Sequence, residues 1–366
     1  MPTPTVIICI DGLDPEYLDS GDMPNLRAMG ASGFLKTGRS MMPSVTNVNN
    51  VSLVTAAYPE THGICSNYAL VRETGEEVYM ESSEYILTET IFQRADSQGK
   101  TAIFVTAKDK LRGLLGTGTA LSISSERPPS DVVEAIGPPP KIYSLEVNGW
   151  VIDAGTYIMG QREADLVYLT TTDYAMHTYA PGEPEARNHL AILDEAIGRL
   201  IEAHPEATVL LTADHGMSAK SSMVDLKRTL AQRGISSNPV PIIKDRYIVH
   251  HSNLGGCAFV HLAGGDIDEA VKVLRETQGV EDVMTREEAV AMLRLHGGRI
   301  GDIVVTGAED VVFGDPTQVS MPPHLRSHGS QHERDIPLVG YNGDFEGFVF
   351  EENRDIGRYV FERVLG

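Results

Sequence analysis

Acidic and histidine side chains recur where apolar stretches of this 366-residue chain break into polar residues. In "TTDYAMH" (171–177) an Asp and a His stand four residues apart, which puts both on one face of a helical turn, where they can share an ion. In "TADHG" (212–216) the adjacent Asp and His point in different directions from a loop. An early Asp, a Thr in a polar stretch and a late His complete the candidate set, which is Asp11, Thr46, Asp173, His177, Asp214, His215 and His328.

These residue types indicate a metal centre. Zn²⁺ accepts carboxylate oxygens and imidazole nitrogens, and the set offers more donors than one tetrahedral ion needs, so the sequence predicts two ions. Each residue taken alone has an ordinary alternative, because an Asp after a strand is often a helix cap and a single His is often only hydrogen-bonded. Five further histidines compete for the site, namely His62, His189, His250, His251 and His332.

Thr46 is the candidate nucleophile. A lone threonine is usually a turn or cap residue, but a metal ion can lower the pKa of its hydroxyl directly, without a neighbouring base. The stretch "PSVTNVNN" (43–50) predicts a polar turn that leads into a helix. Thr46 would then lie near the helix N-terminus, where an anionic group is also favoured.

The elements that position these residues alternate between strand and helix. Apolar runs at 5–12, 100–108, 164–177 and 207–216 predict buried strands, and their carboxyl ends are where open α/β sheets place their chemistry. Helical spacing of apolar residues occurs near 23–33, 88–99 and 183–205. The pattern predicts an α/β fold with a mostly parallel central sheet and helices on both faces.

A smaller α+β cap is expected to be inserted into this core. "YIVHH" (247–251) and "GCAFVHLA" (256–263) look like strands, and two amphipathic helices and another pair of strands follow. The Gly- and Pro-rich stretch 111–149 is assigned to the same cap. The expected core is therefore 1–110, 150–217 and 325–366, with a core strand at 335–342, and the expected cap is 111–149 and 218–324.

The charge of the chain restricts its partners. The net charge is −21 and the acidic residues are dispersed, so nucleic acid is not an expected partner. A small anionic substrate would need local positive charge, and "TAKDKLRG" (106–113) supplies Lys108 and Lys110 at a strand end. If this segment is extended, both ammonium groups project into one pocket. No apolar run approaches the ~20 residues of a membrane span, the three cysteines suggest no disulfide framework, and a cytoplasmic location is expected.

The motifs resemble the alkaline phosphatase superfamily, in the branch that contains nucleotide pyrophosphatases/phosphodiesterases and phosphonoacetate hydrolases. The segments that carry the resemblance follow one another in family order over nearly the whole chain: "IDGLDPEYL", "MPNLRAMGASG", "PSVTNVNNVSLVTAAYPETHGI", "TTDYAMHTYAPG", "TADHGM" and "SHG". Within this branch, "TAKDKLR" and "RYIVHHSNLGG" are similar to the phosphonoacetate hydrolases. The fold itself does not name the substrate.

The resemblance implies roles for single residues. One zinc would be held by Asp173, His177 and His328, with His328 preferred to His332 because "SHG" carries the family pattern, and His62 would be structural. The other zinc would be held by Asp11, Asp214 and His215, with Thr46 beside it as a further ligand and nucleophile. Lys108, Lys110 and Asn67 would bind the substrate. Mn²⁺ or Fe²⁺ are alternatives to Zn²⁺.

The activity that the resemblance implies is hydrolysis of the C–P bond of phosphonoacetate, a small anionic phosphonate, to acetate and phosphate. One alternative is a nucleotide pyrophosphatase/phosphodiesterase or another phosphate-ester hydrolase of the superfamily. Another is a catalytically silent metal-binding protein. The assembly is left open, with a homodimer as one candidate.

Overall fold

One central sheet organises the fold of residues 3–72, 74–247 and 249–366, which the computed structural model describes. The strand order is β2-β17-β8-β1-β7-β5-β6. Strands β8, β1, β7, β5 and β6 run parallel, and β17 is antiparallel to both of its neighbours. The strands are β1 Thr5–Cys9, β2 Phe34–Arg39, β5 Ala102–Thr106, β6 Leu121–Ser124, β7 Leu166–Thr170, β8 Thr208–Thr212 and β17 Asp335–Tyr341.

The sequences of the inner strands explain why the sheet is covered on both faces. β1, β5 and β7 are runs of apolar and β-branched residues that are buried at every position. They therefore lack the alternation of a half-exposed strand. Their register aligns Cys9 with Thr170 and Thr212, and Thr106 with Thr170, so β1, β5, β7 and β8 end at one level. The polar residues that follow these strands consequently lie at one edge of the sheet.

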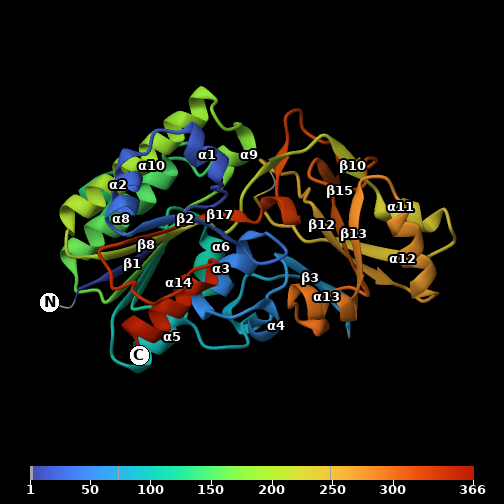
Figure 1. The fold of residues 1–366 in the computed structure, drawn as a ribbon, viewed down its shortest axis with the longest axis horizontal. Coiled ribbons are helices and arrows are strands. Elements are labelled where there is room, and N and C mark those ends of the chain that lie inside the picture. Colours follow the sequence, from blue (N-terminus) through green and yellow to red (C-terminus); the bar gives the residue numbers. More distant parts are fainter. Residues whose placement is uncertain (1–2, 73, 248) are drawn as a thin grey trace.

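Helices cover both faces of the sheet, which confirms the predicted α/β class (Figure 1). One face carries α1 Pro15–Ser20, α2 Pro24–Ser32, α8 Val147–Gln161, α9 Tyr174–Thr178 and α10 Pro184–Ala203. The other carries α3 Thr46–Thr55, α5 Ile91–Ser97 and α14 Arg354–Tyr359. Further helices are α4 Pro59–His62, α6 Asp109–Leu115 and α7 Ser130–Ile136. Among the described residues, none of the helices combines the length and the apolar character that a membrane crossing needs.

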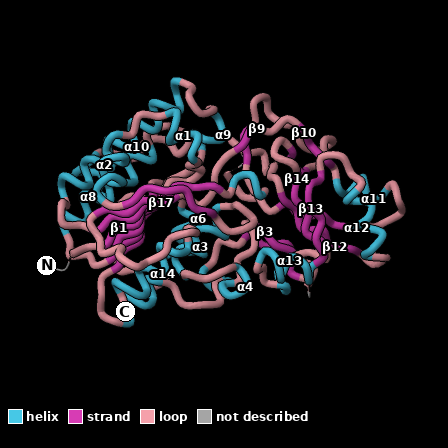
Figure 2. The backbone as a smooth tube through the Cα atoms, viewed as in Figure 1, coloured by secondary structure: helices cyan, strands magenta, loops and turns pink. Residues whose placement is uncertain are grey.

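A second, antiparallel sheet lies beside the first (Figure 2). Its order is β11-β12-β14-β13, with β11 Ser237–Pro241, β12 Cys257–Leu262, β13 Val280–Thr285 and β14 Ile303–Gly307. Its helices are α11 Leu226–Ala231, α12 Ile267–Arg275 and α13 Arg286–Leu293. A separate apolar cluster that includes Leu230, Val260 and Leu274 forms its core. We call this unit the cap. Three two-stranded ribbons complete the fold: β3 Tyr68–Val71 with β4 Glu76–Tyr79, β9 Ser218–Ala219 with β16 Arg326–Ser327, and β10 Ser222–Val224 with β15 Val311–Phe313.

Two expectations about the cap require correction. The segment 111–149 was expected there, but β6 pairs in parallel with β5 at the edge of the central sheet. The reason is topological, because α6 forms the crossover of a β5-α6-β6 unit and Gly118, at φ +86°, permits the tight turn before β6. "YIVHH" was expected to be a strand, but Val249, His250 and His251 lie in a turn, and Ile248 is outside the described residues.

Candidate metal centre

Three buried carboxylates lie at the carboxyl ends of neighbouring strands. Asp11 follows β1, Asp214 follows β8, and Asp173 follows β7 as the N-cap residue of α9. Their exposed fractions are 1%, 0% and 2%. The loops are locked together, because the amide of Gly12 donates to Asp214 Oδ1 at 3.2 Å. Both carboxylate oxygens of Asp11 lack a hydrogen-bond partner among the described residues, a deficit that a bound cation would remove.

Three histidines present the same ring nitrogen to these carboxylates. In His177, His215 and His328, the Nδ1–H donates to a backbone carbonyl, which accepts only, so Nε2 keeps its lone pair. The acceptors and N···O distances are Arg326 at 2.6 Å, Gly216 at 2.9 Å and Ser44 at 2.7 Å, respectively. This is the arrangement of metal-ligating histidines, whose second nitrogen is held by a carbonyl or carboxylate.

The donors form overlapping groups whose atoms all lie within 4.8 Å of one another. Asp11, Asp214 and His215, which the resemblance assigns to one ion, form one group. His328 was expected to form a group with Asp173 and His177. In the structure, His250 of the cap groups with Asp173 and His177, and His328 groups with Asp173 and His215. His328 nevertheless lies near the first pair, with its Nε2 3.8 Å from Asp173 Oδ2.

A buried hydrogen-bond network fixes the loop that carries His328. Ser44, in the segment that leads into α3, donates from Oγ to the carbonyl of Ser330 at 2.6 Å. Ser330 in turn donates from its amide and its hydroxyl to Glu333, at 2.9 and 2.8 Å. Lys220 neutralises Glu333 at 2.8 Å, with both side chains fully buried. The loops around His328 and Thr46 are therefore held as one unit.

The pKa values of the carboxylates reflect their crowding. Burial raises the pKa of Asp11 well above its usual value, and the charges of Asp173 and Asp214 add to the shift. Burial and the charge of Asp173 raise the pKa of Asp214 to about 7. Burial would also raise the pKa of Asp173, but the Lys108 ammonium at 2.9 Å and the ring of His177 hold it well below its usual range. In the protein alone, two of the three carboxyls therefore resist ionisation.

Thr46 is the first residue of α3 and is 3% exposed. Its Oγ1 lies 3.4 Å from His215 Nε2, which brings it to the Asp11 group. Asn50, one helical turn later, donates to the carbonyl of Thr46 at 3.0 Å and to Asp214 Oδ2 at 3.3 Å, and accepts from Tyr168 at 2.6 Å. Asn50 was not singled out in the sequence, although an asparagine at i+4 within a buried helix is a signal of such a role.

Asn67 lies beside the start of the same helix. Its side-chain oxygen accepts from the amide of Asn47 at 3.1 Å, next to Thr46 in the sequence. The backbone of Asn67 is held on both sides, by the carbonyl of Ile242 at 3.1 Å and the amide of Met80 at 3.0 Å. With its oxygen engaged, the Asn67 amide nitrogen is the group that remains to donate to a ligand.

Lys108 and Lys110 converge, but not for the expected reason. The segment is not extended throughout, because Lys108 is the N-cap residue of α6 and Lys110 lies inside the helix. Their ammonium groups are 5.7 and 5.5 Å from the centre of the Tyr247 ring, and both side chains are buried. Lys108 pairs with Asp173, and Lys110 pairs with Asp245 of the cap at 2.5 Å. Asp245 and Tyr247 were missed because only the folded chain brings them here.

The five competing histidines differ in their location and contacts. His62 is buried and bonds Ser52 at 2.8 Å, as expected for a structural residue, and His189 donates to the carbonyl of Leu145 at 2.9 Å. His332 pairs with the partly exposed Glu281 on the surface. His250, from the cap, reaches the metal centre, with its Nε2 3.3 Å from Asp173 Oδ1, whereas Nε2 of His251 lies 3.3 Å from Asp245 Oδ1.

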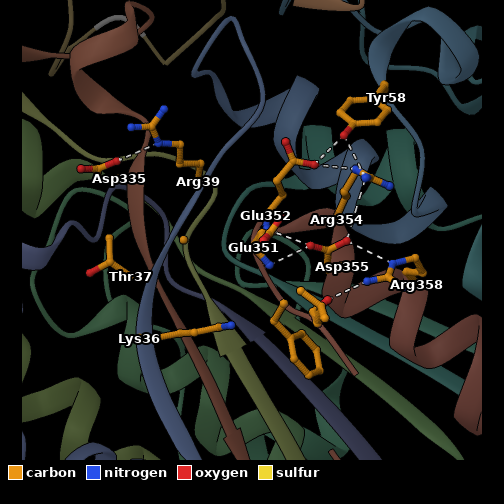
Figure 3. A pocket seen from close by; sticks show the side chains of 13 residues that line it. Lys36, Thr37, Arg39, Tyr58, Asp335, Glu351, Glu352, Arg354, Asp355 and Arg358 are labelled. Carbon is orange, nitrogen blue, oxygen red and sulfur yellow. Dashed lines mark hydrogen bonds and ion pairs between the residues drawn. The ribbon is translucent and has the colours of Figure 1, made fainter. Parts of the chain in front are cut away.

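An open cavity of about 690 Å³ lies elsewhere, between β2 and the segment around α14 (Figure 3). The described residues that line this cavity include none of the expected site residues. Six of its eight charged side chains form ion pairs, at 3.6 Å for Arg39–Asp335, 2.8 Å for Arg354–Glu352 and 3.1 Å for Arg358–Asp355. This cavity lacks the donor set of the metal centre.

Comparison with known proteins shows which family and which structures this chain resembles. A model of the family described as type I phosphodiesterase / nucleotide pyrophosphatase matches residues 5–331. The crystal structure of phosphonoacetate hydrolase from Sinorhizobium meliloti 1021 in complex with phosphonoacetate is similar, with a TM-score of 0.91 and 33% sequence identity. The match covers 99% of this chain and 96% of that one. A structure of murine ectonucleotide pyrophosphatase / phosphodiesterase 5 shares the fold, with a TM-score of 0.73, 17% identity and coverage of 99% and 95%.

More distant similarity links the chain to larger proteins. Venom phosphodiesterase of Naja atra is 26% identical over 231 residues, which are 60% of this chain and 27% of that protein. Ectonucleotide pyrophosphatase/phosphodiesterase family member 1 of Homo sapiens is 29% identical over 237 residues, which are 60% and 24%. The chain thus spans about a quarter of the length of the curated relatives that it matches.

Metal binding should release protons at low pH. Because the pKa of Asp214 is raised to about 7, its carboxyl is mostly protonated at pH 6 and must lose that proton to bind an ion. We therefore expect affinity for divalent metal to fall as the pH drops below about 7, with more protons released at pH 6 than at pH 8.5. Calorimetric titration of metal-free protein in two buffers of different ionisation enthalpy measures this release. Equal proton release at both pH values would contradict the assignment of Asp214 as a metal ligand. Asp214→Asn should reduce the difference in proton release between the two pH values.

Proposed function

The chain belongs to the type I phosphodiesterase / nucleotide pyrophosphatase family, and from this membership and the lysines buried beside its carboxylates we propose that it hydrolyses the C–P bond of phosphonoacetate to acetate and phosphate. The observation that carries the proposal is the convergence of Lys108 and Lys110 on the Tyr247 ring. A carboxylate and a phosphonate carried by one small molecule both require positive charge. The similarity to a phosphonoacetate complex over 99% of the chain supports the same substrate.

We assign the donors to two divalent ions, with zinc as the proposed metal. Asp173, His177 and His328 would hold one ion, and their buried, carbonyl-anchored rings fit it. Asp11, Asp214 and His215 would hold the other, next to Thr46. Bound zinc would lower the pKa of the threonine hydroxyl and draw charge from the phosphonate oxygens. His215 has its Nδ1–H engaged by the carbonyl of Gly216, so its Nε2 is the nitrogen that would bind this ion.

The residues of the chain then have defined tasks. The hydroxyl proton of Thr46 passes to solvent as Oγ1 attacks phosphorus, the new O–P bond forms as the C–P bond breaks, and the electron pair of the C–P bond moves to carbon. The adjacent carboxylate spreads this charge as an enolate, which takes a proton from water to give acetate. Lys108 and Lys110 stabilise the developing charge, and Asn67 donates to a phosphoryl oxygen. Water then attacks the phosphorus of phosphothreonine, which releases phosphate and restores the hydroxyl.

Family membership also favours a second candidate, hydrolysis of a nucleotide diester or pyrophosphate, because the matching family model carries that description. A third candidate is a metal-binding protein without catalysis. A cytoplasmic location and a homodimer stay predictions that rest on sequence alone.

Activity against a small panel decides between these functions. We expect zinc-loaded protein to release phosphate from phosphonoacetate and to turn over a nitrophenyl nucleotide ester poorly. Thr46→Ala should lower kcat by roughly 10³-fold or more because the nucleophile is lost, while Thr46→Ser keeps a hydroxyl and serves as the matched control. Efficient hydrolysis of the nucleotide ester without phosphate release from phosphonoacetate would establish the second candidate instead. Two-ion protein inactive on the whole panel would establish the third.

Lys110 offers a cleaner test of substrate specificity than Lys108, which also contacts the expected metal ligand Asp173. Lys110→Ala should lower kcat/KM for phosphonoacetate by about 10²-fold, because a buried cation facing the leaving group is removed. Turnover of an aryl phosphate ester, which lacks the carboxylate, should change far less. Lys141→Ala removes an exposed lysine and is the control. An equal loss for both substrates would remove Lys110 from carboxylate recognition.

A further inference from the structure

His250 is a buried residue of the cap whose polar atoms the cap does not use. It lies in the loop between β11 and β12, here called the cap loop (residues 242–256, of which 248 is not described). Its side chain is 0% exposed. The ring packs among Tyr143, Tyr174 and His177, with centroid separations of 5.5, 6.2 and 4.9 Å. The packing therefore holds the imidazole against the metal centre.

Both ring nitrogens of His250 lack a hydrogen-bond partner among the described residues. Buried polar groups are almost always satisfied, so an unsatisfied imidazole aimed at a carboxylate points to a missing partner. The nearest carboxylate oxygen is Asp173 Oδ1, which lies 3.3 Å from Nε2. Asp173 is one of the expected metal ligands, and His177, another, belongs to the same group of atoms within 4.8 Å.

The distances allow one ion to contact both residues. Two donors on one tetrahedral zinc, each bound at 2.0–2.1 Å, lie about 3.4 Å apart. His250 Nε2 lies 3.3 Å from Asp173 Oδ1, and His177 Nε2 lies 2.9 Å from Asp173 Oδ2. The inference rests on this grouping of atoms and on the unsatisfied ring nitrogens of His250 together.

We propose that His250 is a further protein ligand of the ion held by Asp173 and His177, so that this ion joins the cap to the core. The inference rests on the two-ion centre of the proposed function. It assigns the ion a donor that comes from the cap, whereas Asp173, His177 and His328 follow strands of the core sheet or the β9-β16 ribbon.

The neighbouring His251 shows why only one of the pair is assigned. His251 Nδ1 accepts from the amide of Asn253 at 2.9 Å, so its proton is on Nε2. That nitrogen faces Asp245 Oδ1 at 3.3 Å, and because it carries the proton it has no lone pair for a metal ion. His251 is equally buried and sits in the same turn. It is therefore a matched control for His250.

A fourth donor has a consequence for substrate binding. If Asp173, His177, His328 and His250 all held one tetrahedral ion, it would have no open position, whereas catalytic zinc sites keep one open. An oxygen of the substrate would then add as a fifth donor or replace one of the four. His250 is the least fixed of the three histidines, because it alone lacks a backbone carbonyl on its second nitrogen. Its exchange would couple substrate entry to the cap loop.

Metal binding tests this ligand independently of activity. We expect His250→Ala to weaken one of two bound ions by about 100-fold or more in a chelator competition, and to leave the other unchanged. His251→Ala should keep both affinities near those of the wild type. In His250→Cys loaded with Co²⁺, a thiolate at the ion should give a sulfur-to-cobalt charge-transfer band, and His251→Cys should not.

The outcomes separate this inference from the proposed function. Two unchanged affinities in His250→Ala, or no charge-transfer band in a folded His250→Cys that binds two cobalt ions, would overturn the ligand assignment. A raised KM for phosphonoacetate with both affinities unchanged would place His250 on the substrate and would also overturn it. Wild-type protein that binds two ions yet hydrolyses no phosphonoacetate would refute the proposed function while the ligand assignment is tested as before.

Discussion

The repulsion among carboxylates that the sheet forces together is the constraint on which this site depends. Parallel strands ending at one level bring Asp11, Asp173 and Asp214 into a buried region, and the cap adds Asp245. Two ammonium groups, of Lys108 and Lys110, face these four carboxylates, which leaves two negative charges uncompensated. Burial and this uncompensated negative charge raise the pKa values of Asp11 and Asp214. Two divalent ions would change the local charge of these groups from −2 to +2. A positive site of this kind suits a phosphonate dianion, even though the chain as a whole carries a net charge of −21.

Rigid support follows from the same constraint, because ligands that repel one another must be held by other contacts. The Nδ1–H groups of His177, His215 and His328 are each bound to a backbone carbonyl from a different part of the chain. Asn50 joins the helix of Thr46 to Asp214, and the buried Lys220–Glu333 pair stabilises the loop after His328. The donors are thus fixed before an ion arrives, which lowers the cost of assembling the centre.

The sequence could predict the parts of the site that depend on local pattern. Unbroken apolar runs ending in Asp located the strand ends, and the i,i+4 spacing of Asp173 and His177 located a helical turn. The convergence of the lysines was predicted although the backbone is a helix N-terminus and not an extended segment. The cap loop could not be predicted. "YIVHH" has strand propensity, but local hydrogen bonds favour a turn: the side-chain oxygens of Asn253 and Asp245 accept from nearby backbone amides, and the amide of Asn253 donates to His251 Nδ1. Which of its side chains reach Asp173 depends on how the cap packs on the core, a property that no local pattern records.

The cap loop also determines what a substrate must do to enter. Asp245 accepts from the amide of Tyr247 at 2.6 Å and pairs with Lys110, while Tyr247 lies over both lysines. Lys110 holds the pKa of Asp245 well below its usual range against the effect of burial, so the pair is ionic. A carboxylate that binds Lys110 must therefore replace another carboxylate. Such an exchange leaves the number of charge-assisted hydrogen bonds unchanged, whereas an apolar group would leave the buried ammonium unpaired at a cost of several kcal/mol. The loop consequently favours a small molecule with its own carboxylate over a phosphate ester that has none, because only the former restores the charge that it displaces.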